Sequence, residues 1–444
     1  MKKTLLSIGV FAMTFAIYGQ NTPTLIKKCV TEEYMQYRES VQPGYIQATK
    51  DAFEVAKASQ EGVVLKNNET LRIPVVVHVV YDETRPEMNL ADSVIHNQIK
   101  ILNDDFNRTN ADTTNMRSDF NIVTGEGLNI VFELAAFDPQ GNPTTGITRT
   151  STTTSSFLDF TGMMDGGGIA EKVKYTAEGG SDAWDQSRYM NIWVCNMALV
   201  LFSQEIPMVL GYATPPADMP NWPEEGVGNM SDGVVVQYQF FGSNNPTVGI
   251  EDYEVLGRTV THEVGHYLGL RHIWGDAENC IEDDGIEDTP NATENSQESG
   301  CIHKNTCDND DIYGVDLPDM WENYMDYSDE SCQNSFTNKQ IALMRGVLEN
   351  QRADLVAEDN GALAIKEDTK LNVAMHPNPT NNFVTLVSDK NLKGAIKIVD
   401  LSGKIVAESF INGIQTTIDV SHLQSGIYQV FVEGKTGASK LVKF

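Results

Sequence analysis

The apolar positions along the chain follow two periods, one that predicts buried strands and one that predicts amphipathic helices. Residues 71–81 (LRIPVVVHVVY) are an almost unbroken β-branched run, which is typical of a buried strand. Apolar residues recur with helical spacing from Ile95 to Phe106, after Asp92 or Ser93, either of which can cap a helix. Further strands are predicted at residues 128–137, 189–197 and 233–241, the last at the edge of the sheet beside the cleft. The pattern predicts an α/β domain, with a twisted mixed sheet backed by helices.

The N-terminal part of the chain has a different pattern. Residues 1–19 begin with two lysines and continue with an apolar stretch, which predicts a signal peptide. No other segment approaches the 18 apolar residues that a membrane-spanning helix needs. Residues 20–65 are polar with helical patches at 31–37 and 51–59, so we interpret them as a pro-segment. His78, inside the first strand, is expected to be a hydrogen-bonded core residue.

The C-terminal part of the chain is predicted to be a separate small domain. Residues 356–370 are polar and predict a linker, and residues 371–444 contain short alternating runs separated by Gly-containing turns. This pattern predicts an all-β sandwich. The expected strands cover residues 383–388, 395–399, 404–410, 416–420 and 427–432.

The run HEVGHYLGLRH at residues 262–272 carries the chemistry of the chain. On a helix, His262 and His266 lie on one face and can bind one metal ion, and Glu263 lies beside them. Gly269 can adopt a left-handed conformation that ends the helix, so that His272 returns to the same ion. Three protein ligands leave a fourth position for water, which is the arrangement of a catalytic zinc site.

The alternative interpretation of this run is a surface helix that happens to contain histidines. Three of the chain's eight histidines fall within it, which makes chance unconvincing. Val260, Val264 and Leu268 also form a separate apolar stripe on the side away from the histidines. The helix is therefore predicted to pack one face on the core and present the other to a cleft. Ligand spacing alone indicates a hydrolytic zinc site.

The motif resembles that of the metzincin peptidases, which also have a Met-containing turn downstream. The run 262–275 (HEVGHYLGLRHIWG) and the turn NYMDY around Met325 are similar to the pappalysin family, in its cytophagalysin branch. The resemblance extends upstream through residues 189–195 and 211–213 and implies a metzincin-like protease domain over residues 66–355. It also implies zinc and endopeptidase activity.

The same resemblance implies roles for several further residues. Met325 is expected under the zinc as a hydrophobic floor, and Tyr327 is expected to stabilise the oxyanion of the intermediate, unless it is only structural. Glu330 matches the position at the base of a specificity pocket, where relatives that prefer Arg or Lys after the cut bond have Asp. Implied disulfides join Cys280 with Cys307 and Cys301 with Cys332. Cys195 is expected to be a buried free thiol.

Acidic residues are concentrated after the zinc motif. Seven of the thirteen residues from 276 to 288 are acidic, and residues 273–303 contain no Lys or Arg. Crowded carboxylates repel each other unless they are hydrated or bind a hard cation. By resemblance we expect calcium here, and the alternative is a solvated acidic loop. The expected calcium ligands are Asp276, Asp284, Asp288 and Thr289.

Cys29 stands alone near the start of the predicted pro-segment. One hypothesis is a latency switch, in which the thiolate occupies the open zinc position and the adjacent Lys27 and Lys28 favour that thiolate. The segment around it resembles a Cys-containing pro-segment motif of the family, although Val30 replaces the usual Gly. The alternative is an unremarkable pro-segment cysteine.

Charge and the C-terminal motifs indicate the partners and destination of the chain. The net charge is −30, with 62 acidic and 32 basic residues, which disfavours nucleic acid and anionic lipid as partners. The runs HPNPT (376–380), VDLSGK (399–404) and KLVKF (440–444) resemble the C-terminal sorting domain of type IX secretion. This resemblance implies the type IX machinery as a partner and secretion from, or display on, a Bacteroidetes-type bacterium. The alternative is an adhesive β-sandwich.

These observations predict a secreted zinc endopeptidase that cleaves protein or peptide substrates and is made as a precursor. Glu263 is expected to act as the general base on a zinc-bound water. A rival interpretation is a zinc-stabilised adhesin that binds protein without cutting it. Glu263 argues against that rival, because a purely structural site needs no base.

Overall fold

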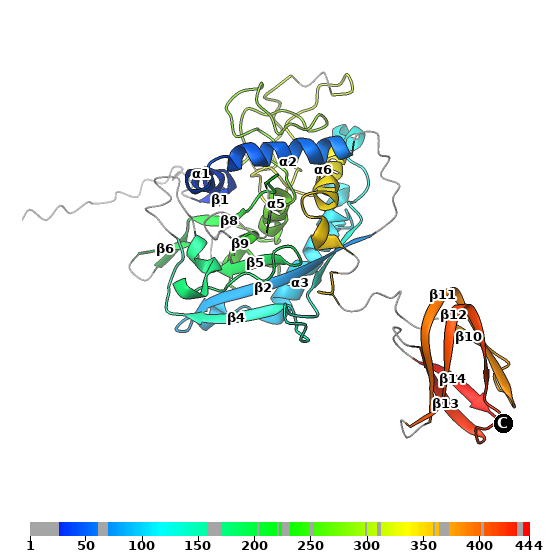
Figure 1. Cartoon of the computed structure of the whole chain (residues 1–444). Helices are drawn as coiled ribbons and strands as arrows, with labels where there is room; N and C mark the ends of the chain where they lie inside the picture. Colours follow the sequence, from blue (N-terminus) through cyan, green and yellow to red (C-terminus); the bar gives the residue numbers. More distant parts are fainter. Residues whose placement is uncertain are drawn as a thin grey trace, which may run out of the picture. The chain divides into compact units, whose positions relative to one another are not determined.

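The computed structural model describes residues 26–60, 70–158, 170–201, 204–219, 222–223, 231–247, 253–297, 300–308, 312–357, 360–363, 373–400, 404–432 and 438–444. The predicted signal peptide at residues 1–19 lies outside these ranges. By internal contacts the chain divides into one unit of residues 1–132 and 147–357 and a second of residues 133–146 and 358–444 (Figure 1). The predicted boundaries of the pro-segment, protease domain and linker stay predictions.

The first unit is built on a seven-stranded mixed sheet. Its main path runs β1-β8-β9-β5-β2-β3, and β4 also pairs with β2. Neighbours β1/β8, β9/β5, β5/β2 and β2/β4 are parallel, whereas β8/β9 is antiparallel. The strands are β1 (Lys27–Cys29), β2 (Leu71–Asp82), β3 (Ile130–Leu134), β4 (Ile147–Thr152), β5 (Met190–Cys195), β8 (Val209–Ala213) and β9 (Val234–Gln237); β6 (Ala198–Leu201) and β7 (Gln204–Pro207) form a separate hairpin.

The predicted first strand is confirmed as β2, whose apolar side chains are buried on both faces of the sheet. His78 in this strand is a satisfied core residue, as expected. Its Nδ1 lies 2.8 Å from Thr148 Oγ1, its Nε2 lies 3.0 Å from Asn191 Oδ1, and its ring stacks on Trp193. Burial lowers the pKa of His78 to about 4, so the ring is neutral.

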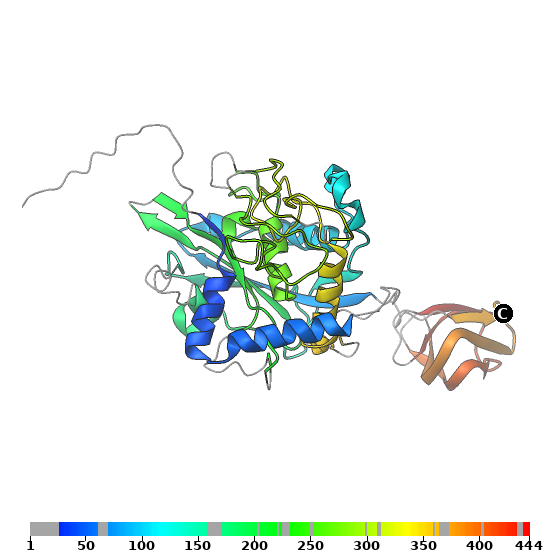
Figure 2. The same cartoon turned by 90° about the horizontal axis from the view of Figure 1, so that it is seen from above.

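The helices lie against this sheet and against one another (Figures 1 and 2). Thr337 caps α6 through a capping box with Gln340, and α6 ends at residue 349. The α-helices are α1 (Thr31–Val41), α2 (Tyr45–Ser59), α3 (Asp92–Phe106), α5 (Arg258–Tyr267) and α6 (Asn338–Glu349). Short 3-10 helices cover Pro86–Met88, Ala111–Asn115, Ser118–Ile122, Glu171–Lys174, Thr176–Glu178, Tyr238–Phe240 and Ala353–Val356.

The prediction that residues 233–241 form the edge strand beside the cleft is wrong. Only Val234–Gln237 are extended, and this strand, β9, lies inside the sheet between β5 and β8. Strand β8 packs against Glu263 of α5 through Gly211, and β1 of the predicted pro-segment pairs with β8 in parallel and forms the edge of the sheet. All four residues of β9 are buried, which is consistent with its inner position. The sequence pattern alone does not give the order of the strands.

The long loop between α5 and α6 contains both disulfides that the family resemblance implied. Cys280 bonds Cys307, and Cys301 bonds Cys332. Cys195 is a buried free thiol in β5, as expected. These bonds tie together a segment that has little regular secondary structure of its own.

The second unit contains a five-stranded antiparallel sheet with its own apolar core, which confirms the all-β prediction. The predicted strands at 383–388 and 395–399 belong to one long strand that is irregular between Val387 and Leu392. Its strands are β10 (Val373–His376), β11 (Phe383–Val399), β12 (Ile405–Asp419), β13 (Gly426–Val432) and β14 (Ser439–Lys443). In the described parts of the chain, no helix has the length and apolar character needed to cross a bilayer.

Candidate metal centre and active site

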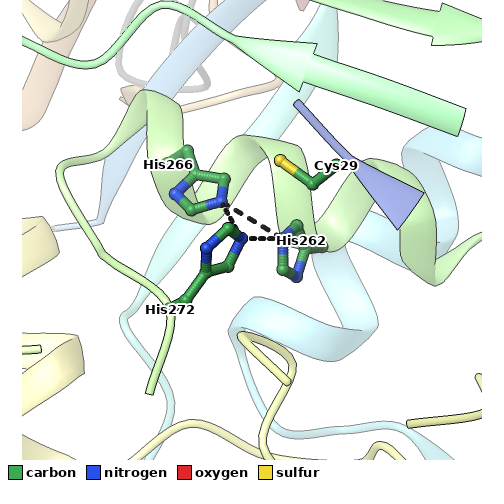
Figure 3. Close-up of side chains that lie close together, drawn as sticks. All are labelled: Cys29, His262, His266 and His272. Carbon is green, nitrogen blue, oxygen red and sulfur yellow. Dashed lines mark hydrogen bonds between the residues drawn. The ribbon is translucent and has the colours of Figure 1, made fainter. Parts of the chain in front are cut away.

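Three imidazole rings converge at one point below β8. The Nε2 atoms of His262, His266 and His272 lie 3.1 to 3.2 Å from one another (Figure 3). Three ligands placed about 2.0–2.1 Å from a tetrahedral zinc ion would be separated by about 3.3 Å. The rings therefore have the spacing of a set of zinc ligands.

The other nitrogen of each ring is held by a hydrogen-bond acceptor. His262 Nδ1 donates to the Tyr324 carbonyl at 2.7 Å, and His266 Nδ1 donates to the Leu270 carbonyl at 2.8 Å. His272 Nδ1 donates to Asp276 Oδ1 at 2.7 Å. Because each Nδ1 carries the proton, each Nε2 presents a lone pair to the other two. Three facing lone pairs repel unless a cation lies between them, so the residues fit a metal ion.

Helix α5 places these rings as the sequence predicted. Val260, Val264 and Leu268 are buried on its far side. Gly269 has φ +93°, which lets the chain reverse and bring His272 back. Met325 is fully buried, and a Cβ at Gly265 would lie 2.4 Å from its sulfur. Met325 thus forms the floor under the helix.

Glu263 is buried beside the histidines, under strand β8. A Cβ at Gly211 would lie 2.7 Å from Glu263 Cγ, so a glycine in β8 leaves the room for this side chain. Its Oε2 accepts from Cys29 Sγ at 3.4 Å and Thr31 Oγ1 at 3.3 Å, whereas its buried Oε1 has no partner. Burial raises the pKa of Glu263 well above its usual range.

Cys29 joins the histidines as the fourth member of the group. Its Sγ and the three imidazoles offer ligand atoms that all lie within 4.8 Å of one another (Figure 3). Among the described residues, this is the only such group of His, Cys, Asp or Glu. Strand β1 carries Cys29 there by pairing in parallel with β8, where Cys29 is opposite Gly211.

The expectation that Lys27 and Lys28 favour the Cys29 thiolate is wrong. Lys27 pairs with Glu33, and Lys28 donates to the Ser328 carbonyl at 2.7 Å. Burial and the adjacent Glu263 raise the pKa of Cys29 well above its usual range. Because both ammonium groups contact other residues, they do not stabilise the Cys29 thiolate. A bound metal ion would favour that thiolate.

Aromatic rings enclose the exposed side of the site. The Tyr327 hydroxyl donates to the Cys29 carbonyl at 3.1 Å, and its ring lies against His262 and His272. Trp274 stacks on His272 with centroids 4.4 Å apart. Tyr327 thus already hydrogen-bonds a peptide carbonyl beside the histidines. Trp274 belongs to the family motif, but its position in the sequence did not predict that it stacks on His272.

Glu330 lies at a pocket and also contacts the start of α5, and the sequence indicated only the first of these. Its carboxylate accepts from the amides of Leu256, Arg258 and Thr259 and from the Thr259 hydroxyl, at 2.5 to 3.1 Å. It thereby caps the N-terminus of α5. It also lines a small pocket beside His262 and Glu263 that includes Lys28.

The four expected calcium ligands divide into two sets. Asp276 Oδ1 is bound to His272, as described above. Asp284, Asp288 and Thr289 are buried, and each leaves one buried side-chain oxygen without a partner. Burial raises the pKa of Asp284 well above its usual range and that of Asp288 to about 6. A buried oxygen of this kind can be satisfied by a cation, a proton or a water molecule.

Several residues that shape the site had no signal in the sequence. The carbonyls of Leu270 and Tyr324 orient two histidines, and Thr31 contacts Glu263. Arg352 is buried and donates to the carbonyls of Tyr267 and Thr214, which ties the end of α5 to the segment after β8. Their roles depend on backbone positions that only the fold brings together.

Comparisons with known proteins agree with this geometry. Residues 176–349 match the sequence model of peptidase family M43, pregnancy-associated plasma protein-A. The structure is similar to Tannerella forsythia mature mirolysin in complex with a cleaved peptide, with 40% identity, coverage of 67% of this chain and 99% of that chain, and a TM-score of 0.55. A promirolysin mutant from the same organism is 36% identical, covering 76% of this chain and 100% of that one, with a TM-score of 0.60. The chain therefore belongs to the pappalysin family of M43 peptidases, a family of metalloproteases.

Curated relatives share shorter segments. An extracellular metalloprotease of Arthroderma gypseum is 39% identical over 126 residues, 28% of this chain and 38% of that protein. One of Verticillium alfalfae is 36% identical over 158 residues, 34% of this chain and 50% of that protein. The chain spans only 29% to 38% of the length of the extracellular metalloproteases of three Arthroderma species, A. gypseum, A. otae and A. benhamiae.

The C-terminal unit also has a family match. Residues 374–444 match the secretion system C-terminal sorting domain, which confirms that resemblance. The chain therefore carries the sorting signal of type IX secretion in Bacteroidetes, and this signal implies the secretion machinery as a partner.

The contact between Asp276 and His272 generates a prediction about metal affinity. Replacing Asp276 with Ala removes the acceptor that fixes the His272 tautomer, and we expect Zn²⁺ to bind about 10- to 100-fold more weakly. The measurement is competition with a chromogenic chelator, in a Glu263→Ala background to prevent self-cleavage. The exposed Glu278→Ala is the matched control. Unchanged zinc affinity in Asp276→Ala would show that Asp276 does not orient the ligand.

Proposed function

We propose that this protein is a secreted zinc endopeptidase made as a latent precursor. The observation that carries the proposal is the set of three bare Nε2 atoms, 3.1 to 3.2 Å apart, with the buried Glu263 carboxylate beside them. A structural zinc site has four protein ligands and needs no base. Here the fourth potential ligand is the Cys29 thiol, and Cys29 lies in the predicted pro-segment.

The residues of this chain have separate roles in the proposed reaction. When bound, zinc would polarise the peptide carbonyl and lower the pKa of a water molecule. Glu263 accepts a proton from the attacking water and delivers it to the leaving amine, which its raised pKa suits. Tyr327, which now binds the Cys29 carbonyl, becomes available to donate to the oxyanion once β1 leaves.

A basic residue after the cut bond is the proposed preference. The pocket that Glu330 lines already receives the Lys28 side chain, whose ammonium group lies near Asp326, Asp329 and Glu330. The Glu330 carboxylate is shared with the N-terminus of α5, so it contributes less charge to the pocket than a free carboxylate. The Ser328 carbonyl and the three acids together favour Lys or Arg.

The proposed activity and preference are tested together. Activated enzyme should release peptides from a mixed protein substrate, and N-terminal sequencing should show Arg and Lys enriched at the new termini. Glu263→Gln should lower the cleavage rate by about 10²- to 10⁴-fold while the protein still binds zinc. Full activity in Glu263→Gln, or in zinc-free protein, would contradict the mechanism. New termini without basic enrichment would remove the preference alone.

Latency is proposed to rest on Cys29 and on the strand that carries it. The proposal is supported by the Cys29 Sγ, which lies within 4.8 Å of the ligand atoms of the three histidines, and by β1, which pairs with β8 beside Glu263. A peptide substrate cannot reach that edge while β1 is paired there. The alternative, an unremarkable pro-segment cysteine, does not explain why its thiol is buried at the metal centre.

Replacing Cys29 with Ala is expected to shorten the lag before the precursor cleaves a fluorogenic peptide. The reason is that the metal's fourth position is then open to water. Activity is followed over time, with gels to show when the pro-segment is lost. Cys195→Ala, which removes another buried free thiol, is the matched control. An unchanged lag in Cys29→Ala would contradict the switch.

Calcium is proposed to occupy the loop that contains Asp284, Asp288 and Thr289. Each offers a buried oxygen without a partner, and oxygen donors suit a hard cation. Asp276 remains a proposed ligand only through its second oxygen, because the first binds His272. Without a cation, the raised pKa values of Asp284 and Asp288 mean that protonation would have to neutralise them.

Calcium is expected to raise the unfolding temperature of the zinc-loaded protein. Saturation at about 100 times the dissociation constant adds about 2.7 kcal/mol, a shift of several degrees. Differential scanning calorimetry in zinc-containing buffer, with and without calcium, measures it. Asp284→Asn should abolish the calcium-dependent shift, whereas Asp308→Asn, outside the proposed set of ligands, should keep it. A wild-type protein insensitive to calcium would rule out the site.

A further inference from the structure

The pro-segment helix α2 places one aromatic ring in a slot on the protease domain. Phe53 is 3% exposed, and the guanidinium of Arg271 lies 4.0 Å from the centre of its ring. Arg271 immediately precedes the metal-site residue His272 in the sequence. The slot is therefore attached directly to the segment that carries the third histidine.

Backbone borders the slot at the edge of the ring, next to the guanidinium. Gly285 has φ +81°, and a Cβ there would lie 3.0 and 3.1 Å from two atoms of the Phe53 ring and 3.4 Å from Arg271 Nη1. Any side chain at this position would take the space of the ring. The slot thus offers a guanidinium group to one face of an aromatic ring, and the glycine leaves room for the edge of that ring.

The slot opens into a cavity that reaches the metal centre. This cavity, of about 610 Å³, is lined by Phe53 and Arg271 and also by His266, His272, Leu270 and Pro216. The smaller pocket with Glu330 is lined instead by His262 and Glu263. The two spaces therefore flank the histidine cluster. If the residue after the cut bond enters the Glu330 pocket, the residues before that bond extend into the larger cavity.

Charge decides which side chain the slot prefers. Arg271 is surrounded by Asp283 and Asp284 of its own domain and by Glu32 and Glu54 of the pro-segment helices. Two of these carboxylates remain when the pro-segment leaves, so the guanidinium charge stays partly balanced. A further carboxylate would meet like charges, whereas a neutral ring uses the guanidinium face without adding charge.

We propose that, after the pro-segment is removed, the slot between Arg271 and Gly285 binds an aromatic side chain of the peptide substrate, in the stretch that precedes the cleaved bond. The inference rests on the proposed peptidase function and adds a subsite to it. In the precursor, Phe53 fills this subsite and keeps it closed. Phe53 and the substrate ring compete for the same surface.

The experiment uses activated full-length enzyme and a set of peptides with one cleavable bond before a fixed Arg. A single Phe is moved through the positions before that bond, with Leu and Ala as replacements. At one position we expect kcat/KM for the Phe peptide to exceed that for the Leu peptide by about threefold to tenfold. The gain should appear in KM, because the slot is remote from the reacting atoms.

Two variants test the walls of the slot, and the Phe/Leu ratio is compared within each enzyme. Arg271→Lys keeps the charge but loses the planar face, and Gly285→Ala fills the space of the ring. Both should bring the ratio close to one, whereas the neighbouring Glu287→Gln should keep the wild-type ratio. Thermal unfolding identifies misfolded protein; if Gly285→Ala does not fold, Arg271→Lys decides the result.

No aromatic preference at any position, or a preference retained in both variants, would overturn the proposal. An equal loss in Glu287→Gln would also overturn it, because the effect would then belong to the loop and not to the slot. Failure of every enzyme to cleave any peptide would instead overturn the proposed function. The Ala peptides therefore distinguish the two failures.

Discussion

The metal centre depends on the hydrogen bond that the Nδ1 atom of each imidazole donates. Two backbone carbonyls and one carboxylate accept the Nδ1 protons of the three histidines, which forces the three Nε2 lone pairs toward one another. Without a cation this arrangement is repulsive, and with one it is a preformed set of ligands. The Tyr324 carbonyl belongs to the Met-containing turn and the Leu270 carbonyl to the reversal after Gly269. The turns that define the family motif therefore orient the metal ligands.

The sequence predicted the elements well and their spatial order less well. The helical spacing from 95 to 106 and the β-branched run at 71–81 became α3 and β2, because local periodicity reflects burial directly. The edge strand was misassigned, since four buried residues in β9 do not reveal which strand lies outside them. Strand order is set by contacts between segments distant in the chain.

In the candidate site, too, local relations were predictable and contacts between distant segments were not. The histidines and Glu263 are readable because they lie within eleven consecutive residues, where helix geometry fixes their relation. The partners of Glu330 were not predictable, because they depend on a distant loop that returns to α5. Asp276 contacts His272 only four residues away, but the segment between them is not a regular helix whose geometry would predict the contact. Lys28 was assigned to the wrong neighbour for the same reason: sequence adjacency to Cys29 did not predict that its ammonium would reach Ser328.

The disulfide between Cys301 and Cys332 has a consequence for where the enzyme matures. Cys332 is two residues from Glu330, whose carboxylate fixes the start of α5. In a reducing cytoplasm this crosslink stays open, and the anchor of the histidine-bearing helix is held less firmly. Oxidation during export then completes the scaffold outside the cytoplasm. Completion of the scaffold that holds the histidine-bearing helix is thereby coupled to an oxidising compartment.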